Sequence, residues 1–165
     1  MIKRDTYINK IRPFIGNELI KVLTGIRRSG KSVMLELIKD ELRSQGVPDS
    51  QFITFNFESM ANAAYCTANA LYDELTVRIS SIQGKSYLFF DEIQEVEGWE
   101  RCINSARVDF DCDIYITGSN AKLLSGELAT HLGGRYVEFV IYPFSFKEYL
   151  EYRMPKKEIQ QISDE

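Results

Sequence analysis

A glycine-framed segment near the start of this 165-residue chain carries its clearest chemistry. The segment reads Gly25-Ile26-Arg27-Arg28-Ser29-Gly30-Lys31-Ser32. It satisfies every fixed position of the phosphate-binding P-loop, Gly-x-x-x-x-Gly-Lys-Ser/Thr. Its two glycines let the backbone approach a ligand that a Cβ would hinder. The loop amides can then point at an anion on the N-terminus of the next helix. The simpler alternative for the same residues is a glycine turn between a strand and a helix.

The side chains of this segment have separate expected roles. Lys31 supplies a mobile positive charge for the β- and γ-phosphates of a nucleotide, and the Ser32 hydroxyl coordinates Mg²⁺. Arg27 and Arg28 lie inside the loop, where one of them contacts phosphate or a core acid, or both are solvated loop charges. The residues expected to contact the nucleotide are Gly25, Ile26, Arg27, Arg28, Ser29, Gly30, Lys31, Ser32 and Val33.

Two consecutive acids follow a continuous apolar run further along the chain. The run at 88–90 reads Leu-Phe-Phe, and Asp91 and Glu92 come directly after it. Asp91 is placed like a Walker B aspartate, which supports Mg²⁺ beside the P-loop hydroxyl. Glu92 has the position expected of a base that polarises an attacking water. The simpler alternative is a strand end turning into solvent, where acids are common.

The acid pair, Asp91 and Glu92, also helps to distinguish which subclass of P-loop protein this chain belongs to. A GTPase would carry Asp-x-x-Gly here and Asn-Lys-x-Asp later, whereas residues 91–94 read Asp-Glu-Ile-Gln. The one Asn-Lys pair, Asn9 and Lys10, precedes the loop. A small-molecule kinase rarely needs a water-activating acid at this position. ATP hydrolysis is therefore the favoured interpretation, with ATP and Mg²⁺ as ligands.

Polar residues end another predicted strand. Thr117, Ser119 and Asn120 follow the run at 112–116, and any of them could hold the attacking water or sense the γ-phosphate. Ser119 or Asn120 could instead cap a helix N-terminus. Arg135, after a glycine pair, could stabilise charge on the transferred phosphoryl group in cis or from a neighbouring subunit, or form a surface ion pair.

Alternating strand and helix patterns surround these motifs. Strands are expected at 21–24, 51–57, 87–90, 112–116 and 136–141. Helices are expected within 1–20 (ended by Pro13), at 31–43, 69–82 and 99–108, at 123–132 broken around Gly126, and at 144–152. The stretch 58–68 has no clear period. This alternation predicts an α/β fold, with parallel strands joined by right-handed crossovers and helices on both faces. Ligands in such sheets bind at the carboxyl ends of strands, where the P-loop and the acid pair fall.

Composition excludes several other classes. The chain is 44% hydrophobic and 27% charged, as expected for a globular domain with a real core. A net charge of −4 argues against a broad nucleic-acid footprint, although a local basic patch remains compatible with it. No run reaches the ~20 apolar residues of a membrane span, and the N-terminus has no apolar signal stretch. Three cysteines without metal spacing and a single histidine, His131, predict a cytoplasmic protein with reduced thiols and no zinc.

Five stretches together resemble one family. They are Thr24-Gly-Ile-Arg-Arg-Ser-Gly-Lys-Ser32, Leu88-Phe-Phe-Asp-Glu-Ile-Gln94, Thr117-Gly-Ser-Asn-Ala-Lys-Leu-Leu124, Leu132-Gly-Gly-Arg135 and Tyr142-Pro-Phe-Ser-Phe-Lys-Glu-Tyr149. From about residue 5 to 152 the chain resembles the AAA-type ATPase domain of prokaryotic ATPases with a Gly-x-Arg-Arg-x-Gly-Lys-Ser/Thr loop. The double arginine and the Pro-Phe-Ser-Phe stretch make the resemblance more specific than a P-loop alone.

This resemblance implies a three-layer α/β/α P-loop fold of the AAA+/ASCE type. Its five-stranded parallel sheet would have the order 5-1-4-3-2, with Asp91 and Glu92 in Walker B roles and Arg135 as a sensor or finger arginine. We expect residues 1–20 to pack on a core at 21–152, followed by a polar tail at 153–165. Family members usually continue into a C-terminal region with a nuclease-like domain, and this chain is expected to lack that region.

Three functions remain open from the sequence. The first is an ATPase domain that hydrolyses Mg-ATP and drives or switches an unknown protein partner or the missing C-terminal domain, with homo-oligomers possible. The second is a nucleotide-gated binding module with negligible turnover. The third is a DNA-associated ATPase, which the acidic total charge disfavours. No residue of the sequence identifies the base that is bound, and no membrane partner is indicated.

Overall fold

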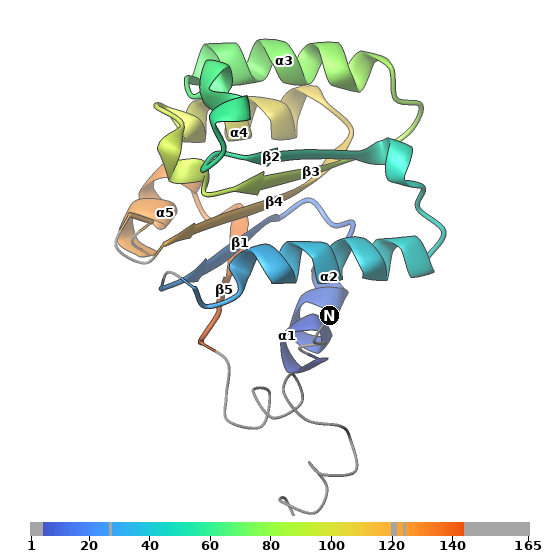
Figure 1. The fold of residues 1–165 in the computed structure, drawn as a ribbon, viewed down its shortest axis with the longest axis vertical. Helices are drawn as coiled ribbons and strands as arrows, with labels where there is room; N and C mark the ends of the chain where they lie inside the picture. Colours follow the sequence, from blue (N-terminus) through green and yellow to red (C-terminus); the bar gives the residue numbers. More distant parts are fainter. Residues whose placement is uncertain (1–4, 27, 120–121, 124, 144–165) are drawn as a thin grey trace, which may run out of the picture.

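The computed structural model describes residues 5–26, 28–119, 122–123 and 125–143. Five strands form one sheet in the order β2-β3-β4-β1-β5, and each neighbouring pair is parallel (Figure 1). The strands are β1 (Ile20–Gly25), β2 (Phe52–Asn56), β3 (Ser86–Asp91), β4 (Cys112–Ser119) and β5 (Tyr136–Val140). This is the expected order 5-1-4-3-2 read in reverse, so the predicted sheet is confirmed.

Helices cover both faces of this sheet (Figure 1). The α-helices are α1 (Asp5–Ile11), α2 (Lys31–Ser44), α3 (Ala68–Ser80), α4 (Trp99–Asp109) and α5 (Ser125–Leu132). The short 3-10 helices are η1 (Arg12–Phe14), η2 (Asp49–Gln51), η3 (Met60–Tyr65) and η4 (Ile93–Glu95). α1 and α2 lie on one face, while α3, α4 and α5 pack on the other. No helix in the described ranges is long and apolar enough to cross a membrane.

Alternation along the buried strands divides the core into two clusters. Val22 and Phe90 face the cluster beneath α3, α4 and α5, whereas the adjacent residues Leu23 and Phe89 face the cluster beneath α1 and α2. All four side chains are fully buried. Successive side chains of a strand point to opposite faces, so a strand covered on both sides carries apolar side chains at consecutive positions. The continuous apolar runs of the sequence are explained by this double covering.

Two element predictions need correction. β4 continues through Thr117 and Gly118 to Ser119, beyond the expected end at residue 116, because these residues pair in register with β1 up to Gly25. α5 is continuous from Ser125 to Leu132, so Gly126 does not break it. A glycine in the first helical turn interrupts no helix interior, which explains its tolerance there. The helix expected at 144–152 and the tail at 153–165 lie outside the described residues.

A buried ion pair fixes the end of the sheet opposite the P-loop. Lys21 Nζ lies 2.5 Å from Asp113 Oδ1, and both side chains are fully buried. Lys21 also donates to the Asn17 carbonyl at 2.9 Å, while Tyr115 Oη and the Gly16 amide donate to Asp113 Oδ2. Burial lowers the pKa of Lys21, against the attraction of Asp113, and burial together with Asp113 raises the pKa of Tyr115. This network ties the segment before β1 to the centre of the sheet.

Replacing Asp113 by Asn should strongly destabilise the fold. The change leaves the Lys21 ammonium buried without a counter-charge, which costs about 3–5 kcal/mol of unfolding free energy. Urea denaturation would measure the loss. Adding Lys21→Met to Asp113→Asn should recover part of it, because the unpaired charge is then removed. Asp49→Asn, at the exposed Arg43 pair, is the control and should leave the midpoint unchanged. A midpoint for Asp113→Asn equal to wild type would contradict this account.

Candidate functional site

The P-loop connects the end of β1 to the start of α2. A Cβ on Gly25 would collide with the backbone oxygen of Ile141 and lie 2.8 Å from Ser29 Oγ, so only glycine fits. Gly30 occupies the N-cap of α2 with a φ of 94°, and no side chain caps the helix there. The first turn of α2 also carries no acidic residue. The uncapped amides and the helix dipole therefore leave a place for an anion.

Lys31 folds back into the loop that it follows. Its Nζ donates to the carbonyl of Gly25 at 3.0 Å and to that of Ile26 at 2.9 Å, and the residue is only 5% exposed. The Ile26 side chain points away, with 54% of its surface exposed. The two carbonyls hold the Lys31 Nζ beside the loop amides. It can exchange these carbonyls for phosphate oxygens without leaving the site.

Asp91, at the end of β3, is bound on both of its oxygens. Ser32 Oγ donates to Oδ2 at 2.6 Å, and Thr117 Oγ1 donates to Oδ1 at 2.6 Å. Asp91 is 6% exposed and Thr117 is fully buried. The predicted partners of Mg²⁺, Ser32 and Asp91, are therefore in direct contact although 59 residues separate them. Hydroxyl and carboxylate oxygens are the hard ligands that Mg²⁺ prefers, so the pair fits this ion.

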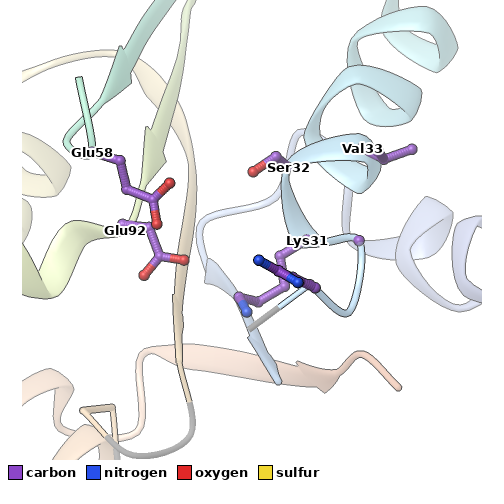
Figure 2. A pocket seen from close by; sticks show the side chains of 7 residues that line it. Lys31, Ser32, Val33, Glu58 and Glu92 are labelled. Atoms are coloured by element: carbon purple, nitrogen blue, oxygen red, sulfur yellow. The ribbon is translucent and has the colours of Figure 1, made fainter. Parts of the chain in front are cut away.

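Glu92 adopts a left-handed backbone conformation, with φ 58° and ψ 54°. This is unusual for a residue with a side chain and is maintained only by its surroundings. Two contacts hold the residue. Its amide donates to Thr117 Oγ1 at 2.9 Å, and the Gln94 side-chain amide donates to its carboxylate. Glu92 lines a cavity across from Lys31 and Ser32 of the P-loop (Figure 2).

A cavity of about 620 Å³ lies between the loop and the acids. Its lining residues are Arg28, Gly30, Lys31, Ser32, Val33, Glu58 and Glu92. Figure 2 shows Glu58 and Glu92 on one wall and Lys31 and Ser32 on the other. The cavity therefore has a cationic wall next to the helix N-terminus and an acidic wall opposite. This division suits a polyphosphate whose terminal group faces the two carboxylates.

The P-loop residues predicted to bind nucleotide divide into two groups. Arg28, Gly30, Lys31, Ser32 and Val33 line the cavity. The others that the structure describes, Gly25, Ile26 and Ser29, do not line it and shape the loop or hold Lys31 instead. Arg27 lies outside the described residues.

The polar end of β4 differs in part from the expectation. Thr117 holds Asp91 and the Glu92 backbone, and does not line the cavity. Ser119 is level with Gly25 in the sheet, and its carbonyl accepts from the Lys122 and Leu123 amides. α5 begins at Ser125, so Ser119 does not cap that helix. Asn120 lies outside the described residues.

Arg135 is not brought to the cavity of its own chain. Its carbonyl accepts from the Ile20 amide at 2.9 Å, which places it beside the amino end of β1, and its side chain is exposed. β1 then runs from Ile20 to Gly25 before the P-loop begins, a rise of about 16 Å at ~3.3 Å per residue. Arg135 therefore faces the opposite end of the sheet, and the cis alternative has no support in this geometry.

Two residues of the site were missed from sequence. Glu58 follows β2 at the same carboxyl edge as Asp91, but the stretch from 58 to 68 has no clear period that would indicate a role. The signal for Glu58 in the sequence is its position just after a predicted strand. Neighbouring parallel strands end at the same edge of the sheet, so the residues that follow them lie close together. Gln94 stands in the sequence only as part of the Asp91-Glu-Ile-Gln94 motif. Its contact with Glu92 depends on the tight turn of η4, which periodicity does not reveal.

His131 has a structural environment in α5. Its ring packs edge-on against Trp99, with 6.5 Å between the ring centroids, and the Asn104 amide donates to its carbonyl at 3.0 Å. Among the residues that the structure describes, no three His, Cys, Asp or Glu side chains cluster as a metal site. The Ser32 and Asp91 pair remains the place where an ion bound to phosphates would be held.

The fold and this loop define an AAA-type P-loop domain. A family model described as "AAA domain" matches residues 17–150, and the chain belongs to that family. An uncharacterised protein of Haemophilus influenzae is 48% identical over 150 residues, which are 91% of this chain and 38% of that protein. The uncharacterised protein MJ1544 of Methanocaldococcus jannaschii is 38% identical over 135 residues, covering 81% and 29%. The chain thus spans less than two fifths of these relatives.

Solved structures share the fold at low sequence identity. PCH-2 of C. elegans matches with a TM-score of 0.59 and 14% identity, over 98% of this chain and 45% of that one. A DNA polymerase III gamma subunit-related protein of Thermotoga maritima matches with a TM-score of 0.58 and 11% identity, over 90% and 49%. At these identities, the similarity is evidence for the fold alone.

Replacing Thr117 by Val should loosen the acid pair. The change keeps the shape but removes both hydrogen bonds of the hydroxyl, leaving Asp91 Oδ1 and the Glu92 amide without this partner. We expect a loss of about 2 kcal/mol in unfolding free energy by urea denaturation, whereas Thr117→Ser should retain most of the stability. Unchanged stability with lost nucleotide turnover would instead assign Thr117 to the attacking water.

Proposed function

We propose that this chain is a Mg-ATP-binding ATPase domain that hydrolyses ATP to ADP and phosphate. The observation that carries the proposal is the Ser32–Asp91 hydrogen bond of 2.6 Å. It joins the P-loop to the strand acid at the edge of a cavity that Glu92 faces. Such an arrangement matches the parts that phosphoryl transfer to water requires: a phosphate cradle, an ion-binding pair and an acid near the terminal phosphate.

The residues of the chain divide this work. Lys31 and the loop amides hold the β- and γ-phosphates, as Lys31 exchanges the carbonyls of Gly25 and Ile26 for phosphate oxygens. Ser32 and Asp91 would hold Mg²⁺, which neutralises charge on the phosphates when bound. Glu92 accepts a proton from the attacking water. Thr117 keeps Asp91 and the Glu92 backbone in place for these steps.

A nucleotide-gated switch with negligible turnover is the second candidate. Two observations favour it: the Glu92 carboxylate is engaged by the Gln94 amide, and Arg135 lies at the opposite end of the sheet. In this case ATP binding alone would change how the chain contacts a partner. The greater length of both curated relatives supports a further domain as that partner, and a second copy of the chain is the other candidate. We place either activity in the cytoplasm.

Glu92→Gln should separate binding from turnover. The amide cannot accept a proton from water, so the rate of ATP hydrolysis should fall roughly a hundredfold or more while Mg-ATP still binds. Lys31→Ala should weaken ATP binding by about tenfold or more, because a charge-assisted hydrogen bond to phosphate is lost. Phosphate release and nucleotide titrations would measure the two effects. If wild type binds Mg-ATP but turns over no faster than Glu92→Gln, the switch is the correct function.

We expect Arg135 to act on the site of a neighbouring copy, because it lies at the opposite end of the sheet from its own P-loop. Arg135→Ala alone should lower turnover, and so should Lys31→Ala. When the two inactive variants are mixed, assemblies form in which an intact loop faces an intact arginine. Partial recovery of hydrolysis in the mixture is the expected result, because one mixed interface contains every required group. A mixture as inactive as its components, at concentrations where the wild type associates, would exclude Arg135 as a trans-acting group.

A further inference from the structure

Glu58 is a second carboxylate on the acidic wall of the cavity. It lies two residues beyond the end of β2, next to the strand that delivers Asp91 and Glu92. The pairing of β2 with β3 continues into this turn, because the Phe57 amide donates to the Asp91 carbonyl at 3.0 Å. Figure 2 shows the Glu58 side chain directed into the same space as Glu92, across from Lys31 and Ser32.

A well-organised turn aims Glu58 at the cavity. Asn56 Oδ1 accepts from the Glu58 amide at 3.0 Å, and the Asn56 carbonyl accepts from the Ser59 amide at 3.1 Å. The Asn62 side chain donates to the same carbonyl at 2.9 Å, so the turn is anchored to η3. Within the part of the chain that the structure describes, no hydrogen bond or ion pair engages the Glu58 carboxylate. The backbone of Glu58 is fixed, and its carboxylate is available to a ligand.

Glu92 differs from Glu58 in this respect. One of its carboxylate oxygens accepts from the Gln94 amide, and its left-handed backbone is held by Thr117. Glu92 can therefore offer its other oxygen to a water molecule in a fixed direction. A water that attacks phosphorus must direct a lone pair at it, and so must turn both of its hydrogens away. A single fixed acceptor orients only one of those hydrogens.

On the basis of the proposed function, we propose that Glu58 is a second catalytic residue, which accepts one hydrogen of the attacking water while Glu92 accepts the other. The water oxygen bonds to the γ-phosphorus, and the bond to the β–γ bridging oxygen breaks with its electron pair leaving on ADP. One water proton passes to a carboxylate on this wall and is then released to solvent, and the other stays on the phosphate product. Glu58 and Glu92 thus position the nucleophile together, and neither is required for the phosphates to bind.

Glu58→Gln tests this role against Glu97→Gln as the matched control. Glu97 is also exposed and loses the same charge, but it does not line the cavity. We expect Glu58→Gln to lower the single-turnover rate of ATP hydrolysis by roughly ten- to a hundredfold. Its affinity for Mg-ADP should be unchanged or higher, since a negative charge facing phosphate is removed. Its affinity for Mg-ADP with fluoroaluminate, which mimics the transferred group, should fall by about tenfold. Glu97→Gln should match wild type in all three measurements.

The outcomes separate this inference from the proposed function. If wild type hydrolyses ATP, Glu92→Gln does not, and Glu58→Gln equals wild type, the role of Glu58 is wrong and the ATPase stands. If Glu58→Gln weakens Mg-ADP as much as it slows hydrolysis, Glu58 binds nucleotide and does not orient water. If wild type shows no hydrolysis in single-turnover measurements, the proposed function fails, and the role of Glu58 fails with it.

Discussion

The geometry of the site depends on the buried carboxylate of Asp91. A buried charge is stable only when its oxygens are engaged, and here two hydroxyls meet that requirement from different elements. Ser32 comes from the start of α2, and Thr117 comes from the end of β4. One side chain therefore fixes the distance between the P-loop, β3 and β4. The same Thr117 hydroxyl accepts from the Glu92 amide, so the direction of that residue depends on the network as well.

Hydrogen bonds within the protein hold the polar groups of the cavity in place, and a ligand can replace these bonds. Lys31 is held by loop carbonyls, and Ser32 is held by Asp91, at ordinary hydrogen-bond lengths. A phosphate or a divalent ion can replace these contacts one for one, so binding requires little rearrangement. The opposite wall carries Glu58 and Glu92, which cannot favour phosphate binding by their charge. Their placement instead suits the orientation of a water molecule that would lie between them and a phosphate bound at the loop.

The parallel sheet separates two regions with different tasks. Its carboxyl edge brings the P-loop after β1, Glu92 after β3 and Glu58 after β2 to one cavity, as strand direction requires. Its amino end carries the buried Lys21–Asp113 pair, which orders the segment before β1. Arg135 lies near this second end, far from the P-loop of its own chain.

The sequence by itself determined the layers, the strand order through a family resemblance, and the core of the site. P-loop spacing and a buried strand ending in Asp91-Glu92 are local patterns, and parallel strands must bring their carboxyl ends together. Tertiary structure alone decided the rest. Thr117 and Ser119 are two residues apart, yet only Thr117 meets Asp91, because β4 continues as a strand beyond Ile116. Glu58 reaches the cavity through a turn that the Asn56 side chain holds. The register of β5 against β1 keeps Arg135 away from the cavity of its own chain. The spacing of residues along the sequence reveals neither arrangement.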